Sequence, residues 1–215
     1  MTTKAKICGI KTPEALDAAI AGGADYVGFV FCITSPRHLE VAEARSLAER
    51  ARGRVGIVVL TVDADDAALD ELAREIAPDF VQLHGRETPE RAAEIKRRLE
   101  RPVIKAIPVR TVEDAAAQSA YAEIADLILF DAKPPVGATR PGGHGQTFDW
   151  TVLREVAGMP FMLSGGLGPE NVAEAIRVTH PAVVDVSSGV ESAPGVKDAE
   201  LIRRFLQAVK TANQT

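Results

Sequence analysis

The 215-residue sequence is poor in cysteine and in aromatic side chains: it has two cysteines, and Phe, Trp and Tyr together make up 5%. Two thiols in a chain of this length do not suggest the disulfide framework of a small secreted domain. No apolar stretch is long enough to span a bilayer, and the N-terminal residues lack the apolar core of a signal peptide. We therefore predict a cytoplasmic protein without membrane contact.

Charge of one sign is not concentrated anywhere along the sequence. The formal net charge is -5, and charged residues make up 26%. The densest basic run, Lys96-Arg97-Arg98, lies between Glu94 and Glu100 and is expected to form a solvated helix face. Because nucleic-acid binding needs clustered Lys and Arg, no nucleic-acid partner is expected.

Motifs for metals and nucleotide cofactors are also missing. The four histidines, His38, His84, His144 and His180, are scattered without the close spacing of a zinc site. There is no phosphate-binding P-loop, and no Gly-x-Gly-x-x-Gly stands between a strand and a helix. The sequence predicts neither a metal nor a cofactor.

The sequence does contain a regular alternation of short apolar runs with stretches rich in Ala, Glu and Arg. Near-continuous apolar strands are covered on both faces, and strands that alternate with helices form parallel βαβ units. Eight units close into a barrel, so we predict an α/β fold: a single (β/α)8 TIM barrel with eight parallel strands over residues 1–215. An open doubly wound sheet is the alternative. The predicted strands are Ala5–Cys8, Tyr26–Phe31, Val55–Leu60, Phe80–Leu83, Val103–Ile107, Leu127–Phe130, Phe161–Leu163 and Val183–Val186.

Several helix starts are also visible. Thr12-Pro13-Glu14 and Thr88-Pro89-Glu90 combine a capping threonine with a proline at the first helical position, and Pro169-Glu170-Asn171 is similar. The long Pro- and Gly-rich connection over residues 133–146 follows a strand end, where loops of barrels usually carry function.

Reactive groups are expected at the carboxyl ends of the strands, where barrels build their active sites. Cys8 ends the first strand and is either an inert buried thiol or, if its pKa falls, a thiolate base. Asp131 ends the sixth strand and either caps a turn or pairs with Lys133, or holds a proton as a general acid. An acid and a base across the barrel suit an isomerisation. His84 either lines this site or lies on its rim.

Glycine pairs follow the last two strands. Ser164-Gly165-Gly166 precedes a predicted helix start, and Ser187-Ser188-Gly189 ends the eighth strand. Backbone amides without side chains can approach a phosphate there, and a helix N-terminus would favour it. The alternative is that these glycines only make tight turns; their pairing on adjacent strands favours phosphate.

The ordered motifs resemble the phosphoribosylanthranilate isomerase family over the whole chain. They are Lys6-Ile7-Cys8-Gly9-Ile10, Gly28-Phe29-Val30-Phe31 with Ser35-Pro36-Arg37, Val81-Gln82-Leu83-His84-Gly85, Asp131-Ala132-Lys133, Gly142-Gly143-His144-Gly145 with Phe148-Asp149-Trp150, Leu163-Ser164-Gly165-Gly166, and Asp185-Val186-Ser187-Ser188-Gly189.

The resemblance implies an Amadori rearrangement in tryptophan biosynthesis. It converts N-(5-phosphoribosyl)anthranilate into 1-(2-carboxyphenylamino)-1-deoxyribulose 5-phosphate. In that scheme Asp131 protonates the furanose ring oxygen, and the thiolate of Cys8 removes the C2 proton. The resemblance further implies that Arg37 pairs with the anthranilate carboxylate and Asp185 orients the site. Gly165, Gly166, Ser188 and Gly189 would hold the phosphate.

Departures from the family pattern concern the walls and rim of the site. Cys32 stands where an aromatic is expected, and His38 replaces a common tyrosine. Rival functions are indole-glycerol-phosphate synthase, ribulose-phosphate epimerase, and a non-catalytic phosphate-binding barrel; the presence of both Cys8 and Asp131 argues against the last. Monomer and homodimer both fit the scaffold.

Overall fold

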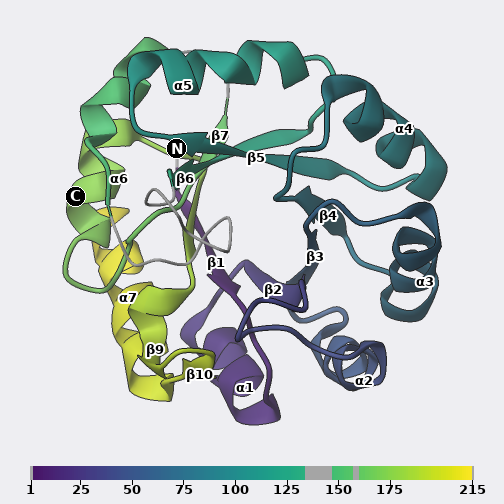
Figure 1. Cartoon of the computed structure of the whole chain (residues 1–215). Helices are drawn as coiled ribbons and strands as arrows, with labels where there is room; N and C mark the ends of the chain where they lie inside the picture. The colour runs from purple at the N-terminus through teal and green to yellow at the C-terminus, as the bar shows by residue number, and fades with distance from the viewer. Residues whose placement is uncertain (1, 134–146, 157–159, 215) are drawn as a thin grey trace.

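The computed structural model describes residues 2–133, 147–156 and 160–214, and in this part of the chain β1 to β8 close into a parallel barrel (Figure 1). The predicted (β/α)8 TIM barrel with eight parallel strands is confirmed, and the open sheet is excluded by the pairing of β1 with β8. The strands are β1 Lys4–Cys8, β2 Tyr26–Phe31, β3 Gly56–Thr61, β4 Phe80–Leu83, β5 Val103–Val109, β6 Leu127–Ala132, β7 Phe161–Leu163 and β8 Val183–Val186.

Helices surround the barrel as an outer ring (Figure 1). Within the described residues none of them combines the length and the apolar character that a membrane span requires. They are α1 Pro13–Gly22, α2 Val41–Ala51, α3 Asp66–Ile76, α4 Pro89–Leu99, α5 Val112–Ala116, η1 Ala117–Tyr121, η2 Trp150–Val156, α6 Val172–Thr179, η3 Ser188–Val190 and α7 Ala199–Ala212.

Two of the predicted helix starts are confirmed. The Thr12 hydroxyl accepts from the backbone N–H of Ala15, and Thr88 accepts from Arg91, each ahead of a proline in the first turn. The third is wrong: Pro169 lies in a turn, and α6 begins only at Val172. The reason is that the Asn171 side chain turns back into the preceding loop instead of capping the helix.

Three aspartates tie strands together at the amino end of the barrel. Asp25, Asp79 and Asp126 each precede an even-numbered strand. They accept from the backbone N–H of Ala5, Ile57 and Val103, respectively, at 2.7 to 2.9 Å. A charge-assisted hydrogen bond of this kind is among the stronger ones in proteins. The device fixes the register of neighbouring strands at the end away from the predicted site.

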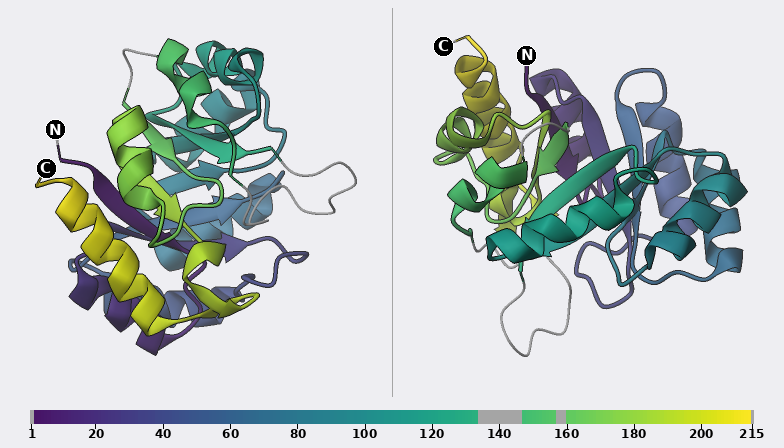
Figure 2. Two further views of the ribbon diagram at one scale, coloured as in Figure 1. Left: turned by 90° about the vertical axis from the view of Figure 1, so that its left-hand side faces the viewer. Right: turned by 90° about the horizontal axis from the view of Figure 1, so that it is seen from above.

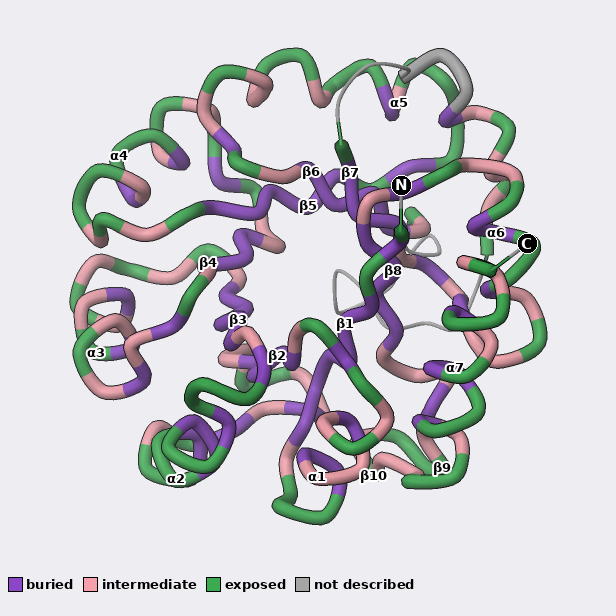
Figure 3. Tube along the Cα trace, turned by 180° about the vertical axis from the view of Figure 1, so that it is seen from behind, coloured by how far each residue is buried: buried purple, intermediate pink, exposed green. Residues whose placement is uncertain are grey.

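The strands are buried on both faces, as Figure 3 shows by the purple tube at the centre and the green outer turns. Outward-facing Ile7, Phe130 and Val184 pack under the helices. Inward-facing Val58, Leu129 and Met162 fill the barrel. Because side chains alternate along a strand, the inward set continues to Cys8 on β1 and Asp131 on β6. Both therefore point toward the barrel axis at its carboxyl end.

The chain ends lie side by side (Figure 2). Thr3 and Asn213 exchange two hydrogen bonds of 2.9 Å, from the Thr3 N–H to Asn213 Oδ1 and from Asn213 Nδ2 to the Thr3 carbonyl. A small antiparallel hairpin, β9 Glu191–Ala193 with β10 Val196–Lys197, follows η3. Gly195 of this hairpin meets the loop after β2, because a Cβ there would lie 2.4 Å from the Pro36 carbonyl oxygen.

Candidate active site

Cys8 shares a buried polar cluster with Lys6 and Asp185. The register of β1 and β8 pairs Lys6 with Asp185, and the Lys6 Nζ lies 2.9 Å from Asp185 Oδ1 with both side chains almost fully buried. Asp185 Oδ2 also accepts from the Ser164 hydroxyl at 3.3 Å. Gly28 leaves room for the cluster, since a Cβ there would come within 2.9 Å of the Cys8 sulfur.

Burial raises the pKa of the Cys8 thiol, and the positive charge of Lys6 and its hydrogen bond oppose that rise. The net direction is opposite to the one that a thiolate base needs. Burial alone would lower the pKa of Lys6, but Asp185 and Cys8 together outweigh it, so the pKa of Lys6 is raised. The ammonium of Lys6 beside Cys8 favours the thiolate, and so does the charge of Lys197.

Asp131 contacts His84. The carboxylate Oδ2 lies 3.2 Å from His84 Nε2, and Oδ1 accepts from the backbone N–H of Ala132 at 2.9 Å. The alternative that Asp131 pairs with Lys133 is wrong, because the Lys133 ammonium lies 2.7 Å from Asp114. Both Asp131 and His84 are about nine-tenths buried, at side-chain exposures of 10% and 12%.

His84 is held from both sides. Its Nδ1 lies 2.9 Å from the amide Nε2 of Gln82, a fully buried residue on β4. The loop after His84 is fixed by a second buried ion pair, Lys105 with Glu87 at 2.8 Å. Glu87 accepts from the Gly85 N–H, and Lys105 donates to the Gly85 carbonyl. These contacts leave the imidazole few alternative positions beside Asp131.

Arg37 lies in a second charged cluster at the mouth. Its Nε and Nη2 donate to the two carboxylate oxygens of Glu191 at 2.7 and 2.8 Å, a bidentate pair. Lys197 lies 2.8 Å from the same carboxylate and donates to the Ser187 carbonyl. Burial would raise the pKa of Glu191, but Arg37 and Lys197 outweigh it and the pKa is lowered. The pairing fixes the guanidinium plane, and among the described residues Nη1 makes no hydrogen bond.

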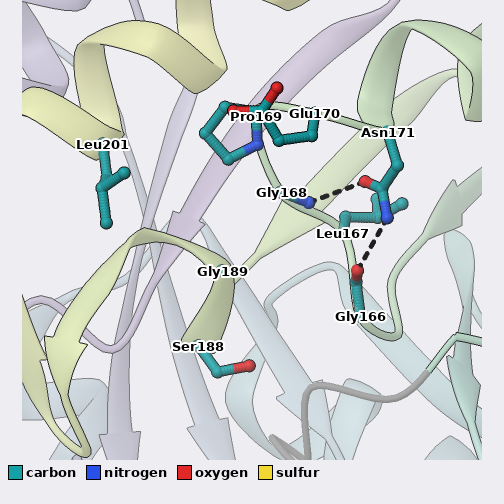
Figure 4. A pocket seen from close by; sticks show the side chains of 9 residues that line it. All are labelled: Gly166, Leu167, Gly168, Pro169, Glu170, Asn171, Ser188, Gly189 and Leu201. Carbon is teal, nitrogen blue, oxygen red and sulfur yellow. Dashed lines mark hydrogen bonds between the residues drawn. The ribbon is translucent and has the colours of Figure 1, made fainter.

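A cavity of about 420 Å³ lies where the loops after β7 and β8 meet (Figure 4). It is lined by backbone-rich residues, among them the predicted Gly166, Ser188 and Gly189. The Asn171 side chain bridges the loop by accepting from the Gly168 N–H and donating to the Gly166 carbonyl. The lining suits an anion that accepts hydrogen bonds from backbone N–H groups.

Two predicted glycines are required by close packing. A Cβ on Gly189 would lie 1.9 Å from the Leu167 carbonyl oxygen, so the two loops touch there. Gly165 is outside the cavity lining; its φ is +88°, and a Cβ would lie 2.5 Å from the Ala132 nitrogen. Gly165 thus brings the loop after β7 against the end of β6. Of the predicted functional loop over residues 133–146, all but Lys133 lies outside the described residues, including its motif Gly142 to Gly145.

The residues of these clusters that were not assigned a role from the sequence are Lys6, Gln82, Glu87, Lys105, Glu191 and Lys197. One signal was available for Lys6, because a charge inside an apolar strand is rarely buried without a partner. The partner itself could not be named, since Asp185 is 179 residues away. Glu191 and Lys197 lie in a short hairpin that the apolar pattern does not predict.

The family model described as N-(5'phosphoribosyl)anthranilate (PRA) isomerase matches residues 5–208. A protein of Rhodopseudomonas palustris (strain BisA53) named N-(5'-phosphoribosyl)anthranilate isomerase is 55% identical over 215 residues, covering 100% of this chain and 99% of that protein. The crystal structure of phosphoribosyl anthranilate isomerase from Thermotoga maritima has a TM-score of 0.89 at 37% identity, covering 98% of this chain and 100% of that one. Another structure, of the isomerase in complex with reduced 1-(o-carboxyphenylamino)-1-deoxyribulose 5-phosphate, has a TM-score of 0.86 at 34% identity, covering 98% of this chain and 100% of that one.

Proposed function

Because the chain belongs to the N-(5'-phosphoribosyl)anthranilate isomerase family, we propose that Asp131 and Cys8 are the acid and the base of its reaction. The activity is the isomerisation of phosphoribosylanthranilate in tryptophan biosynthesis. The observation that carries the proposal is that each of the two side chains, Asp131 and Cys8, has its own neighbouring polar residue. Asp131 is held by His84, and Cys8 lies beside Lys6, both at the carboxyl end of the barrel.

Asp131 opens the sugar ring in this proposal. Its carboxyl proton passes to the furanose ring oxygen, the bond between that oxygen and C1 breaks, and the nitrogen lone pair forms a C1=N double bond. The carboxylate that remains accepts from the Ala132 N–H at Oδ1, and His84 Nε2 lies 3.2 Å from Oδ2, where its N–H would favour the negative charge. Two donors aimed at a group that gains negative charge stabilise the transition state more than the ground state.

Cys8 then moves the second proton. The thiolate takes the proton from C2, and the electrons of that bond form C1=C2 while the C=N electrons return to nitrogen. The enolamine becomes the ketone when C1 gains a proton and the C2 hydroxyl loses one. Lys6 stabilises the thiolate and so opposes in part the burial that raises the pKa of Cys8. No hydride acceptor enters this sequence.

The remaining predicted residues hold the substrate. Gly166, Ser188 and Gly189 line the cavity for the phosphate, and Gly165 positions the loop that contributes to it. The Nη1 of Arg37 binds the anthranilate carboxylate while Glu191 fixes the guanidinium, and Asp185 orients Lys6 and Ser164. The substrate is a small sugar phosphate. A monomer or homodimer, a cytoplasmic location, and the absence of nucleic-acid partners, metal and cofactor stay predictions.

The test is the fluorescence of the anthranilate group during turnover. Asp131→Asn keeps the shape of the side chain but cannot donate the same proton, so kcat should fall by about 10²- to 10⁴-fold. Cys8→Ser should lower kcat by a comparable factor, because an alcohol ionises far less readily than a thiol and therefore supplies almost no anionic base. Asp70→Asn, whose carboxylate pairs with Arg98 on the outer helices, is the control. Activity near wild type in Asp131→Asn would remove this residue from the mechanism.

A further inference from the structure

Gln82 is a buried amide whose presence on β4 is not explained by a contribution to the stability of the fold. It is 0% exposed on β4, and its Oε1 has no hydrogen-bond partner among the described residues. A buried acceptor without a partner is unfavourable, and an apolar side chain of the same size would avoid that penalty. The contact that the amide does make is the 2.9 Å one between its Nε2 and His84 Nδ1.

That contact determines which ring nitrogen of His84 carries the proton. The Gln82 Nε2 can only donate, so His84 Nδ1 must accept and have a free lone pair. In neutral imidazole the proton then sits on Nε2, the nitrogen that lies 3.2 Å from Asp131 Oδ2. In this tautomer His84 therefore turns an N–H, and not a lone pair, toward Asp131 Oδ2.

The other tautomer would oppose the reaction. With its proton on Nδ1, His84 would present a lone pair to Asp131 and could only accept from it. The carboxyl proton would then be directed at the imidazole instead of at the substrate, and the carboxylate left after proton transfer would lose one of its donors. The two tautomers thus differ in whether the carboxyl proton of Asp131 is available to the substrate or is donated to His84.

We propose that Gln82 is a positioning residue for this reaction, which acts by holding His84 in the Nε2–H tautomer beside Asp131. The inference rests on the proposed role of Asp131 as the acid. Gln82 does not touch the reacting atoms; it acts through His84. The buried Oε1 of Gln82, which has no partner within the part of the chain that is described, costs stability. The amide Nε2 in exchange fixes the ring of His84, whose Nε2 lies beside Asp131.

The direct test is ¹⁵N NMR of the histidine rings, which distinguishes protonated from bare ring nitrogens. The resonance of His84 is assigned by its loss in His84→Ala, and spectra are taken at about pH 8, where ordinary imidazoles are neutral. The wild type should show a single Nε2–H form. Gln82→Met, which cannot donate, should show a mixture, and Gln82→Glu, which can only accept, should place a proton on Nδ1.

Kinetics supply the second readout. Gln82→Met should lower kcat by about 10- to 100-fold, the range known for removing the hydrogen-bond partner that orients a metal-bound histidine. KM should stay nearly unchanged, because the phosphate and carboxylate contacts remain. The unfolding midpoint should not fall, since an orphaned buried acceptor has been removed. Gln207→Met is the matched control: this glutamine lies on the exposed face of α7, where its amide contacts Thr211.

The outcomes separate the two proposals. A wild-type tautomer and a wild-type kcat in Gln82→Met overturn the role of Gln82, while an inactive Asp131→Asn still supports the acid. An active Asp131→Asn overturns the acid even if the tautomer shifts as expected. Should Gln82→Met not fold, Gln82→Glu decides by its ring spectrum alone: a proton remaining only on Nε2 contradicts the proposal.

Discussion

Breaking the buried pair of Lys6 and Asp185 should destabilise the barrel strongly. Lys6→Met keeps the volume of the side chain but leaves Asp185 buried, with the Ser164 hydroxyl at 3.3 Å as its remaining contact. Removing one partner of a buried ion pair costs about 3–5 kcal/mol, because the other charge stays out of water. Both side chains are buried, at 0% and 5% exposure, so the upper half of that range applies.

Replacing both partners of the pair should recover most of the stability that the single replacement loses. In Lys6→Met with Asp185→Asn no charge is left uncompensated, and exchanging a buried pair for neutral groups of similar volume is often close to neutral. Urea unfolding followed by circular dichroism at neutral pH measures the four corners of this double-mutant cycle. Lys4→Met is the control, since Lys4 lies at the exposed end of the same strand and should change stability by less than about 0.5 kcal/mol.

The difference in stability between wild type and Lys6→Met should depend on pH with a definite sign. The folded pKa of Lys6 is raised because burial, which lowers it, is outweighed by Asp185 and Cys8 together. A raised folded pKa means stability that is fully present below the unfolded value, about 10.4, and is lost as the pH rises through the folded pKa. The difference in the free energy of unfolding between wild type and Lys6→Met should hence be constant through the neutral pH range. It should shrink only at higher pH. If the free energy of unfolding of Lys6→Met lies within about 1 kcal/mol of the wild-type value at neutral pH, the reasoning is refuted.

Three further outcomes follow from the site. Because burial raises the pKa of Cys8, kcat/KM should still be rising with pH near the ordinary thiol value of about 8.5; a flat profile there would contradict a Cys8 base. Glu191→Gln removes the ion-pair partner that orients Arg37, so KM should rise by about tenfold with little change in kcat, and an unchanged KM would argue against that orienting role. Gly189→Ala puts a methyl group 1.9 Å from a carbonyl oxygen and should raise KM by separating the two phosphate loops, whereas Gly53→Ala, which meets no atom within 4 Å, should leave KM unchanged.

The site clusters show how far strand-end reasoning extends. Cys8 and Asp131 could be chosen because barrels place their chemistry where strands end, and the structure places both side chains inward at that end. The groups that control them were harder to find. Gln82 lies in the middle of an apolar strand, where an amide carries no functional signal until His84 is seen beside it.

The order of apolar runs along the chain was sufficient to determine the barrel. The predicted Tyr26–Phe31, Phe80–Leu83, Phe161–Leu163 and Val183–Val186 agree with β2, β4, β7 and β8 residue for residue, because a strand buried on both faces leaves a continuous apolar signature. Local chemistry likewise determined the capped helix starts at Thr12 and Thr88.

What only the tertiary structure decided is which charges meet. Lys6 finds Asp185 across the closure of the barrel, and Arg37 finds Glu191 across 154 residues of chain. The same holds for the burial that raises the pKa of Cys8. Electrostatic energies depend on distance and on exclusion of water, and neither quantity exists until β1 and β8 close the sheet.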